Sequence, residues 1–179
     1  DEVPHLLEHL GSGEAGELFS FYGYREHNPP HNLDLAPGPQ DTSELLWQIK
    51  RFHNFLFLSG GIFSDYCVHH IDEVCWMQGS WPVKAEAIGA RQLRGVIDDQ
   101  NFDNYGIEYT FENGAKFFYS CQVMKDCDNK FGVWGQGSKG AFAISTKGHS
   151  PARSAIYKGQ RMEKENVLWA AEQPEPNPY

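Results

Sequence analysis

The sequence has no long apolar segment and no excess of positive charge. Its apolar runs are shorter than the roughly 18–20 residues that a membrane-spanning helix needs, and none resembles a signal-peptide core. Acidic residues number 24 against 15 lysines and arginines, which gives a formal net charge of −9. Nucleic acids and anionic membranes are bound by clustered positive charge. The composition therefore disfavours both as partners.

Common catalytic sequence motifs are also missing. The chain has no GxSxG elbow, no P-loop and no HExxH. Gly135–Gly140 matches the GxGxxG pattern of dinucleotide-binding sites, but the residues that follow it alternate like a strand. A bound pyrophosphate needs a helix N-terminus at that place, so we expect a turn between strands and no cofactor site.

Cysteine is scarce, and its spacing does not suggest a metal or redox centre. None of the four cysteines belongs to a CxxC pair. The favoured interpretation is four partly buried thiols, and a disulfide between Cys121 and Cys127 is the alternative.

The composition is typical of one globular domain over residues 1–179. The chain has a mass of 20.3 kDa, and 40% of its residues are hydrophobic and 14% aromatic. A chain of that length and apolarity can bury a core of its own.

Helical spacing dominates the first half of the sequence, and alternation dominates the second. Helices are expected over 4–10, over 41–58 with Asp41 as N-cap and Gly60 as the stop, and over 64–78. A first strand is expected over 17–24. Later strands are expected over 83–93, 105–112, 115–123, 130–136, 140–146 and 154–158, with a hairpin turn at Asn113-Gly114.

This order of elements predicts an α+β fold with one large, mostly antiparallel open sheet and helices packed on one face. The later strands carry large residues on both faces. Phe117, Tyr119 and Cys121 alternate with Phe118, Ser120 and Gln122. One face would meet the helices and the other would expose aromatic surface, so we expect a homo-oligomer formed through the open face.

The segment Gly60–Gly79 is the strongest candidate for chemistry. At about 100° per residue, Asp65, His69, Asp72 and Trp76 share one helix face, and Cys67, Ile71, Val74 and Cys75 form the opposite, buried stripe. Asp65 and His69 are four residues apart, and a carboxylate beside an imidazole suits general acid–base catalysis. The alternative is a solvated helix face with an ordinary Asp–His pair. A metal site is disfavoured, because His69 and His70 point in different directions on a helix.

Gly60-Gly61, Asp65, His69 and Asp72 together resemble the G-G-x-x-x-D-x-x-x-H-x-x-D signature of the glucose-fructose oxidoreductase/inositol dehydrogenase/rhizopine catabolism (Gfo/Idh/MocA) family. Other pieces follow in the family's order: Gly13-Glu14-Ala15-Gly16-Glu17-Leu18, Ala90-Arg91-Gln92, Glu112-Asn113-Gly114 and Gly137-Ser138-Lys139-Gly140. The resemblance covers nearly the whole chain. It implies a C-terminal substrate-binding and oligomerisation domain that is preceded, in the intact protein, by an N-terminal Rossmann domain.

The resemblance also assigns roles. It implies that Asp65 and His69 are catalytic, with His69 moving the proton of a substrate hydroxyl while hydride passes to the nicotinamide. It places His70 near the substrate. It implies that Asp72 and Trp76 support the site without touching the substrate.

Two features depart from the family pattern or lie outside this chain. Tyr24 and Arg25 are expected to contact the substrate, although Tyr24-Arg25-Glu26 replaces the aromatic-Asn ending that is common in the family after the first strand. The family's catalytic lysine belongs to a Glu-Lys-Pro motif of the Rossmann domain.

The implied function is the substrate-binding half of an NAD(P)-dependent oxidoreductase that acts on a sugar, cyclitol or polyol hydroxyl. NAD or NADP would bind the intact protein, and none is expected on this chain alone. The alternatives are an NAD-dependent redox-type glycoside hydrolase and a non-catalytic sugar-binding or assembly domain. A cytoplasmic location is favoured, and an exported periplasmic form is the alternative.

Overall fold

The computed structural model describes residues 2–29, 41–93, 99–148 and 153–172. The elements follow one another as α1 (Glu2–Gly11), β1 (Leu18–His27), α2 (Glu44–Lys50), the 3₁₀ turn η2 (Phe52–Asn54), α3 (Leu56–Ser59), the π-helical turn η3 (Phe63–Cys67), α4 (Val68–Gln78), β2 (Lys84–Ala90), β3 (Asn104–Thr110), β4 (Lys116–Val123), β5 (Lys130–Gly137), β6 (Ala141–Ser145), β7 (Ala155–Tyr157), the 3₁₀ turn η4 (Lys164–Asn166) and β8 (Val167–Ala170).

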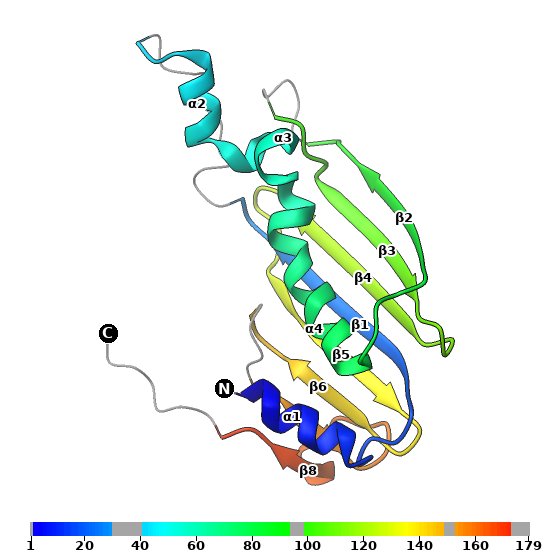
Figure 1. Cartoon of the computed structure of the whole chain (residues 1–179). Helices are drawn as coiled ribbons and strands as arrows, with labels where there is room; N and C mark the ends of the chain where they lie inside the picture. The colour runs from blue at the N-terminus through cyan, green and yellow to red at the C-terminus, as the bar shows by residue number, and fades with distance from the viewer. Residues whose placement is uncertain (1, 30–40, 94–98, 149–152, 173–179) are drawn as a thin grey trace.

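The described strands form one eight-stranded open sheet in the order β2-β3-β4-β1-β5-β6-β7-β8. Strand β1 lies in the middle, parallel to β4 and antiparallel to β5. The other neighbouring strands pair antiparallel (Figure 1). The predicted α+β fold with a mostly antiparallel open sheet is confirmed.

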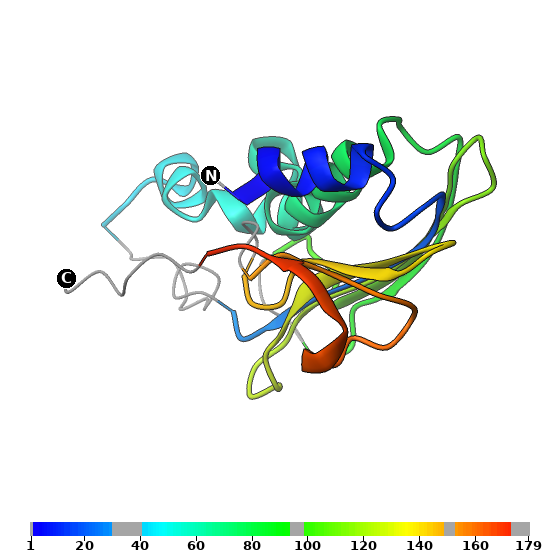
Figure 2. The same ribbon diagram turned by 90° about the horizontal axis from the view of Figure 1, so that it is seen from below.

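The helices lie on one face of this sheet (Figure 2). Helix α4 crosses its centre, and α1 covers the end near β8, where the His9 ring lies 4.6 Å from the Trp169 ring. Leu6, Val74 and Phe117 are fully or almost fully buried between the two layers. Burial of such apolar side chains is the main force that holds the helices to the sheet.

The predicted alternation of the strands is confirmed. Along β4, Phe117, Tyr119 and Cys121 are buried beneath the helices, whereas Phe118 is 40% exposed on the other face. The open face carries stacked rings of Tyr22 and Phe118, whose centroids lie 5.4 Å apart. These rings help to line a shallow groove of about 610 Å³ that extends over β1 to β4.

The prediction of one continuous helix over 41–58 is wrong. Helix α2 begins after Ser43, whose hydroxyl caps the Leu46 N–H, and it ends at Lys50. The chain then turns through η2, and Phe55 adopts an extended conformation before α3. A loop distant in sequence holds this break open, because the side chain of Gln100 accepts from the Leu56 N–H and its backbone N–H donates to Asn54. None of the α2 residues is buried.

Both cysteine interpretations are wrong as well. Cys67 and Cys121 form a disulfide across 54 residues, and Cys75 and Cys127 are free. The disulfide joins the end of η3 to β4. Strand alternation turns the Cys121 side chain to the helix side of the sheet, toward η3. Period-two alternation puts Cys121 on the helix side, but sequence spacing contains no information about which helix residue lies above it.

The GxGxxG segment forms the turn between β5 and β6, as expected. A side chain at Gly137 would collide with the Ala15 carbonyl, so the glycine here permits close packing of two backbones. Strand β8 and the turn η4 were not predicted from the sequence. No helix in the described ranges is long and apolar enough to cross a membrane.

Candidate active site

Asp65 lies on a π-helical turn that opens the long helix. Gly60 and Gly61 both have positive φ, of 72° and 75°, and they turn the chain from α3 into η3. Residues with side chains rarely adopt this conformation, which explains the glycine pair. Helix α4 continues from Val68. A π turn is wider than an α turn, so side chains before and after it are not aligned as ideal α-helical spacing predicts.

The structure pairs Asp65 with a histidine that the sequence analysis did not single out. The Oδ2 atom of Asp65 lies 2.7 Å from Nδ1 of His53, on the 3₁₀ turn η2. His53 is 9% exposed, and its ring packs against Phe52 and Tyr66 at centroid distances of 3.9 and 5.3 Å. The two side chains thus form a close ion-pair contact when the imidazole is protonated.

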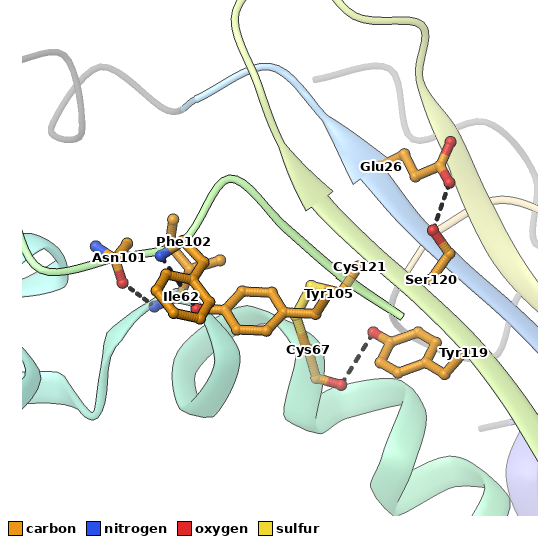
Figure 3. Close-up of a disulfide and its surroundings, with 9 residues drawn as sticks. All are labelled: Glu26, Ile62, Cys67, Asn101, Phe102, Tyr105, Tyr119, Ser120 and Cys121. Carbon is orange, nitrogen blue, oxygen red and sulfur yellow. Dashed lines mark hydrogen bonds between the residues drawn. A yellow bond between two sulfur atoms is a disulfide. The ribbon is translucent and has the colours of Figure 1, made fainter. Parts of the chain in front are cut away.

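A buried asparagine sets the spacing between these two residues. The Oδ1 atom of Asn101 accepts from the Ile62 N–H at 2.8 Å, and its Nδ2 donates to the His53 carbonyl at 2.9 Å. Figure 3 shows Asn101 beside Ile62 at the start of the helical segment. One amide therefore ties the segment that carries His53 to the segment that carries Asp65.

The disulfide fixes the other end of the π turn to the sheet (Figure 3). Tyr119 on β4 donates its hydroxyl to the Cys67 carbonyl at 3.0 Å. Burial raises the pKa of Tyr119, so its hydroxyl stays protonated as a donor. Asp65 thus lies between two anchors, Asn101 before it and Cys67 after it.

Spacings of three and four place the remaining predicted polar face of this helix, His69, Asp72 and Trp76, on one side of α4. His69, Asp72 and Trp76 are exposed on α4, and Trp76 is 58% exposed. His70 is fully buried on the sheet side, where Nε2 lies 3.3 Å from the Gly148 carbonyl.

The predicted buried stripe also needs correction. Cys67, Val74 and Cys75 are buried, but Ile71 is only partly so, and the buried arc extends instead to His70 and Glu73.

Arg25 and Tyr24 are neighbours in sequence but lie on opposite faces of the sheet. Tyr24 is 37% exposed on the open face, and its ring lies 6.2 Å from that of Trp134. Arg25 points to the helix side, where it is 5% exposed. Its guanidinium carbon lies 5.2 Å from the centre of the Tyr66 ring and 4.4 Å from that of Phe131. The structure therefore brings Arg25, and not Tyr24, close to the Asp65 turn.

Glu73 is a second buried charge-bearing group on the helix side that the sequence analysis missed. It is 8% exposed, and burial raises its pKa to about 8, with nearby Arg25 opposing the shift. Burial also lowers the pKa of Arg25 and of His27, whose ring lies 5.5 Å from that of Tyr66. Desolvation thus acts on several ionisable groups around Tyr66, a pattern common at functional sites.

Two further observations concern whether the described residues could hold a metal ion or a dinucleotide. In the described part of the chain, no three His, Cys, Asp or Glu side chains are grouped as metal ligands. The GxGxxG segment ends a strand and begins another, so it offers no helix N-terminus to a pyrophosphate. The described residues therefore provide an ionisable cluster beside Asp65 but no dinucleotide cradle in that segment.

Comparison with solved structures finds the same fold in several oxidoreductases and dehydrogenases. Aldose-aldose oxidoreductase from Caulobacter crescentus, complexed with glycerol, matches with a TM-score of 0.67 and 15% identity over 97% of this chain and 46% of its own. Myo-inositol 2-dehydrogenase from Lactobacillus plantarum matches with a TM-score of 0.61 and 18% identity over 98% and 46%. The WlbA dehydrogenase from Bordetella pertussis, in complex with NADH and UDP-GlcNAcA, matches with a TM-score of 0.63 and 15% identity over 87% and 43%.

The chain thus spans less than half the length of these proteins. Identities this low establish the fold alone. A search of curated proteins gives no significant match. The sequence profile of the GFO/IDH/MocA C-terminal domain matches residues 5–143, which is most of the chain. The chain therefore belongs to the Gfo/Idh/MocA family of oxidoreductase domains.

Proposed function

We propose that this chain is the substrate-binding half of an NAD(P)-dependent oxidoreductase that acts on a sugar, cyclitol or polyol hydroxyl. Asp65 and His69 would handle the proton of that hydroxyl. The observation that carries the proposal is the 2.7 Å pair of Asp65 with His53 on a turn anchored at both ends. Ion pairs on ordinary solvated helix faces are not held in this way.

The residues of this chain would orient the substrate and accept a proton. His69 is the exposed imidazole of the signature, so it is accessible to a hydroxyl from solvent. Asp65 is held by His53, and its charge would stabilise a neighbouring imidazolium as the proton arrives. The nicotinamide, supplied by a Rossmann domain of the parent protein, would accept the hydride.

The open sheet face supports the proposed homo-oligomer. Tyr22, Phe118 and Ile88 lie there together and are 39%, 40% and 80% exposed. An exposed aromatic and aliphatic patch of this kind is characteristic of protein–protein contacts. A second copy of the chain, bringing the same patch, is the proposed partner.

The disulfide supports the exported alternative for the protein's location. Structural disulfides persist in oxidising compartments and are rare where thiols are kept reduced. Cys67 and Cys121 are both fully buried, so their bond belongs to the core and not to a labile surface pair. We therefore favour export over the cytoplasmic location expected from the sequence.

Turnover by the full-length protein tests the proposal. NAD⁺ and NADP⁺ reduction would be followed with myo-inositol, D-glucose and glycerol as substrates. Asp65→Asn and His69→Ala are expected to abolish turnover, whereas Glu8→Gln, which changes an exposed carboxylate on α1, keeps it. Full activity of both variants would contradict the assigned roles. Hydrolysis of a glycoside without net consumption of cofactor would favour the glycosidase alternative. If neither oxidation nor hydrolysis is seen, the result would favour the non-catalytic alternative.

A further inference from the structure

Arg25 is a buried cation without an oxygen partner among the described residues. Its Nε and Nη1 atoms are enclosed, and neither has a hydrogen-bond acceptor there. The side chain is 5% exposed, in the middle of the sheet, beneath η3. Guanidinium groups keep their charge even when buried, so this charge needs compensation.

Two aromatic rings supply part of that compensation. The Tyr66 and Phe131 rings lie 5.2 and 4.4 Å from the guanidinium carbon. A ring face attracts a cation, but it accepts no strong hydrogen bond from the N–H groups. The rings therefore provide no hydrogen-bond acceptor for Nε and Nη1 of Arg25.

The nearby carboxylates do not meet that requirement either. The charges of Asp65 and Glu73 act on Arg25, but no described carboxylate forms an ion pair with it. Asp65 directs its Oδ2 to His53. Both carboxyl oxygens of Glu73 are enclosed and also lack a hydrogen-bond partner there, so Glu73 does not bind the guanidinium, and burial raises its pKa to about 8. The two enclosed nitrogens of Arg25 therefore have no acceptor among the described side chains.

We propose that Arg25 binds a carboxylate group of the substrate, which makes the substrate class a sugar acid and not a neutral sugar. This inference rests on the proposed function, because it places the carboxylate beside the Asp65 turn. A carboxylate is flat and singly charged, and it matches the planar donor set of a guanidinium that lies between two rings. Tyr66 contacts both Arg25 and His53 and is only partly buried, so movement of its ring is the proposed route to Arg25.

The test uses the full-length protein with acetate and acetamide as the smallest matched probes. These molecules have nearly the same shape and differ in charge. The Nε–H resonance of Arg25 would be assigned by NMR from its correlations with the other atoms of the Arg25 side chain. It would then be followed during each titration. Acetate is expected to shift this resonance with saturation, at a dissociation constant about tenfold or more below that of acetamide, as charge-assisted hydrogen bonding predicts.

Two variants extend the test. Arg25→Gln is expected to remove the preference for acetate. Lys130→Gln, which removes an exposed cation next to the Tyr24 ring, keeps it. Equal responses to acetate and acetamide, or no response to either, would overturn the inference, and this measurement in the wild-type protein requires no variant to fold. A preference that survives in Arg25→Gln would also overturn it.

Failure of the inference can be told apart from failure of the proposed function. Turnover of a neutral polyol with no acetate effect overturns the carboxylate site alone. Acetate binding at Arg25 without any reduction of NAD⁺ or NADP⁺ supports the carboxylate site and contradicts the oxidoreductase proposal.

Discussion

Reduction of the Cys67–Cys121 disulfide is expected to destabilise the domain by several kcal/mol. The bond closes a loop of 54 residues. Restriction of the unfolded chain by a loop of this length corresponds to about 4 kcal/mol at room temperature. Both sulfurs are fully buried, so the reduced protein also has two thiols to accommodate in a packed core.

Urea unfolding of oxidised and reduced protein measures this effect. With an unfolding slope of about 2 kcal/mol per molar urea, a loss of about 4 kcal/mol lowers the midpoint by about 2 M. The matched variants are Cys67→Ala, in which reductant should have no further effect, and Cys127→Ser, which should keep the full response because Cys127 is free.

A thiol count gives an independent check of the pairing. Denatured, unreduced protein should show two reactive thiols, from Cys75 and Cys127, out of four cysteines. Four reactive thiols, or an unfolding midpoint that reductant leaves unchanged, would refute the disulfide and with it the argument for an oxidising compartment.

Three further perturbations test the anchors, the buried charge and the open face. Asn101→Leu leaves two buried backbone groups without partners and should cost about 2–5 kcal/mol of unfolding free energy, measured in urea. Glu73→Gln should flatten the pH dependence of stability: because burial raises the Glu73 pKa from 4.5 to about 8, the folded state binds the extra proton and wild-type stability falls as pH rises through that window. A wild-type protein equally stable across it would contradict this assignment. Ile88→Glu should convert the proposed oligomer to monomer in sedimentation velocity, whereas Phe57→Glu, 64% exposed on α3, should not, and a monomeric wild type would contradict the interface.

The strands were predictable because alternation is a local signal. The expected strand over 115–123 corresponds to β4 (Lys116–Val123), and that over 130–136 corresponds to β5 (Lys130–Gly137). Each strand shows its buried and exposed faces within its own residues. The order of the strands in the sheet could not be predicted from such a local signal, because β1 pairs with β4 and β5, about a hundred residues later along the chain.

The position of Asp65 was predictable, but its partner was not. The sequence signature and helical spacing point to His69, four residues away, because a straight α-helix aligns the two. The structure pairs Asp65 with His53, which comes from a separate turn and reaches Asp65 through the break after α2 and the bridge made by Asn101. Each of these features depends on contacts between distant segments. A single polar residue such as Asn101 gives no periodic signal of its role.

The central strand places the two adjacent residues that were expected to contact the substrate on opposite faces of the sheet. Side chains of a strand alternate between faces, so Tyr24 and Arg25 must point in opposite directions. Glycine at position 23 makes room on the helix side for the rings of Phe117 and Tyr119, which fixes which of the two faces is buried. Arg25 follows two residues later on that same side, beneath the Asp65 turn, and Tyr24 joins the aromatic patch. A shift of β1 by one residue would bury Tyr24 and expose the guanidinium, so the register of this strand determines both the charge at the proposed site and the surface of the proposed oligomer.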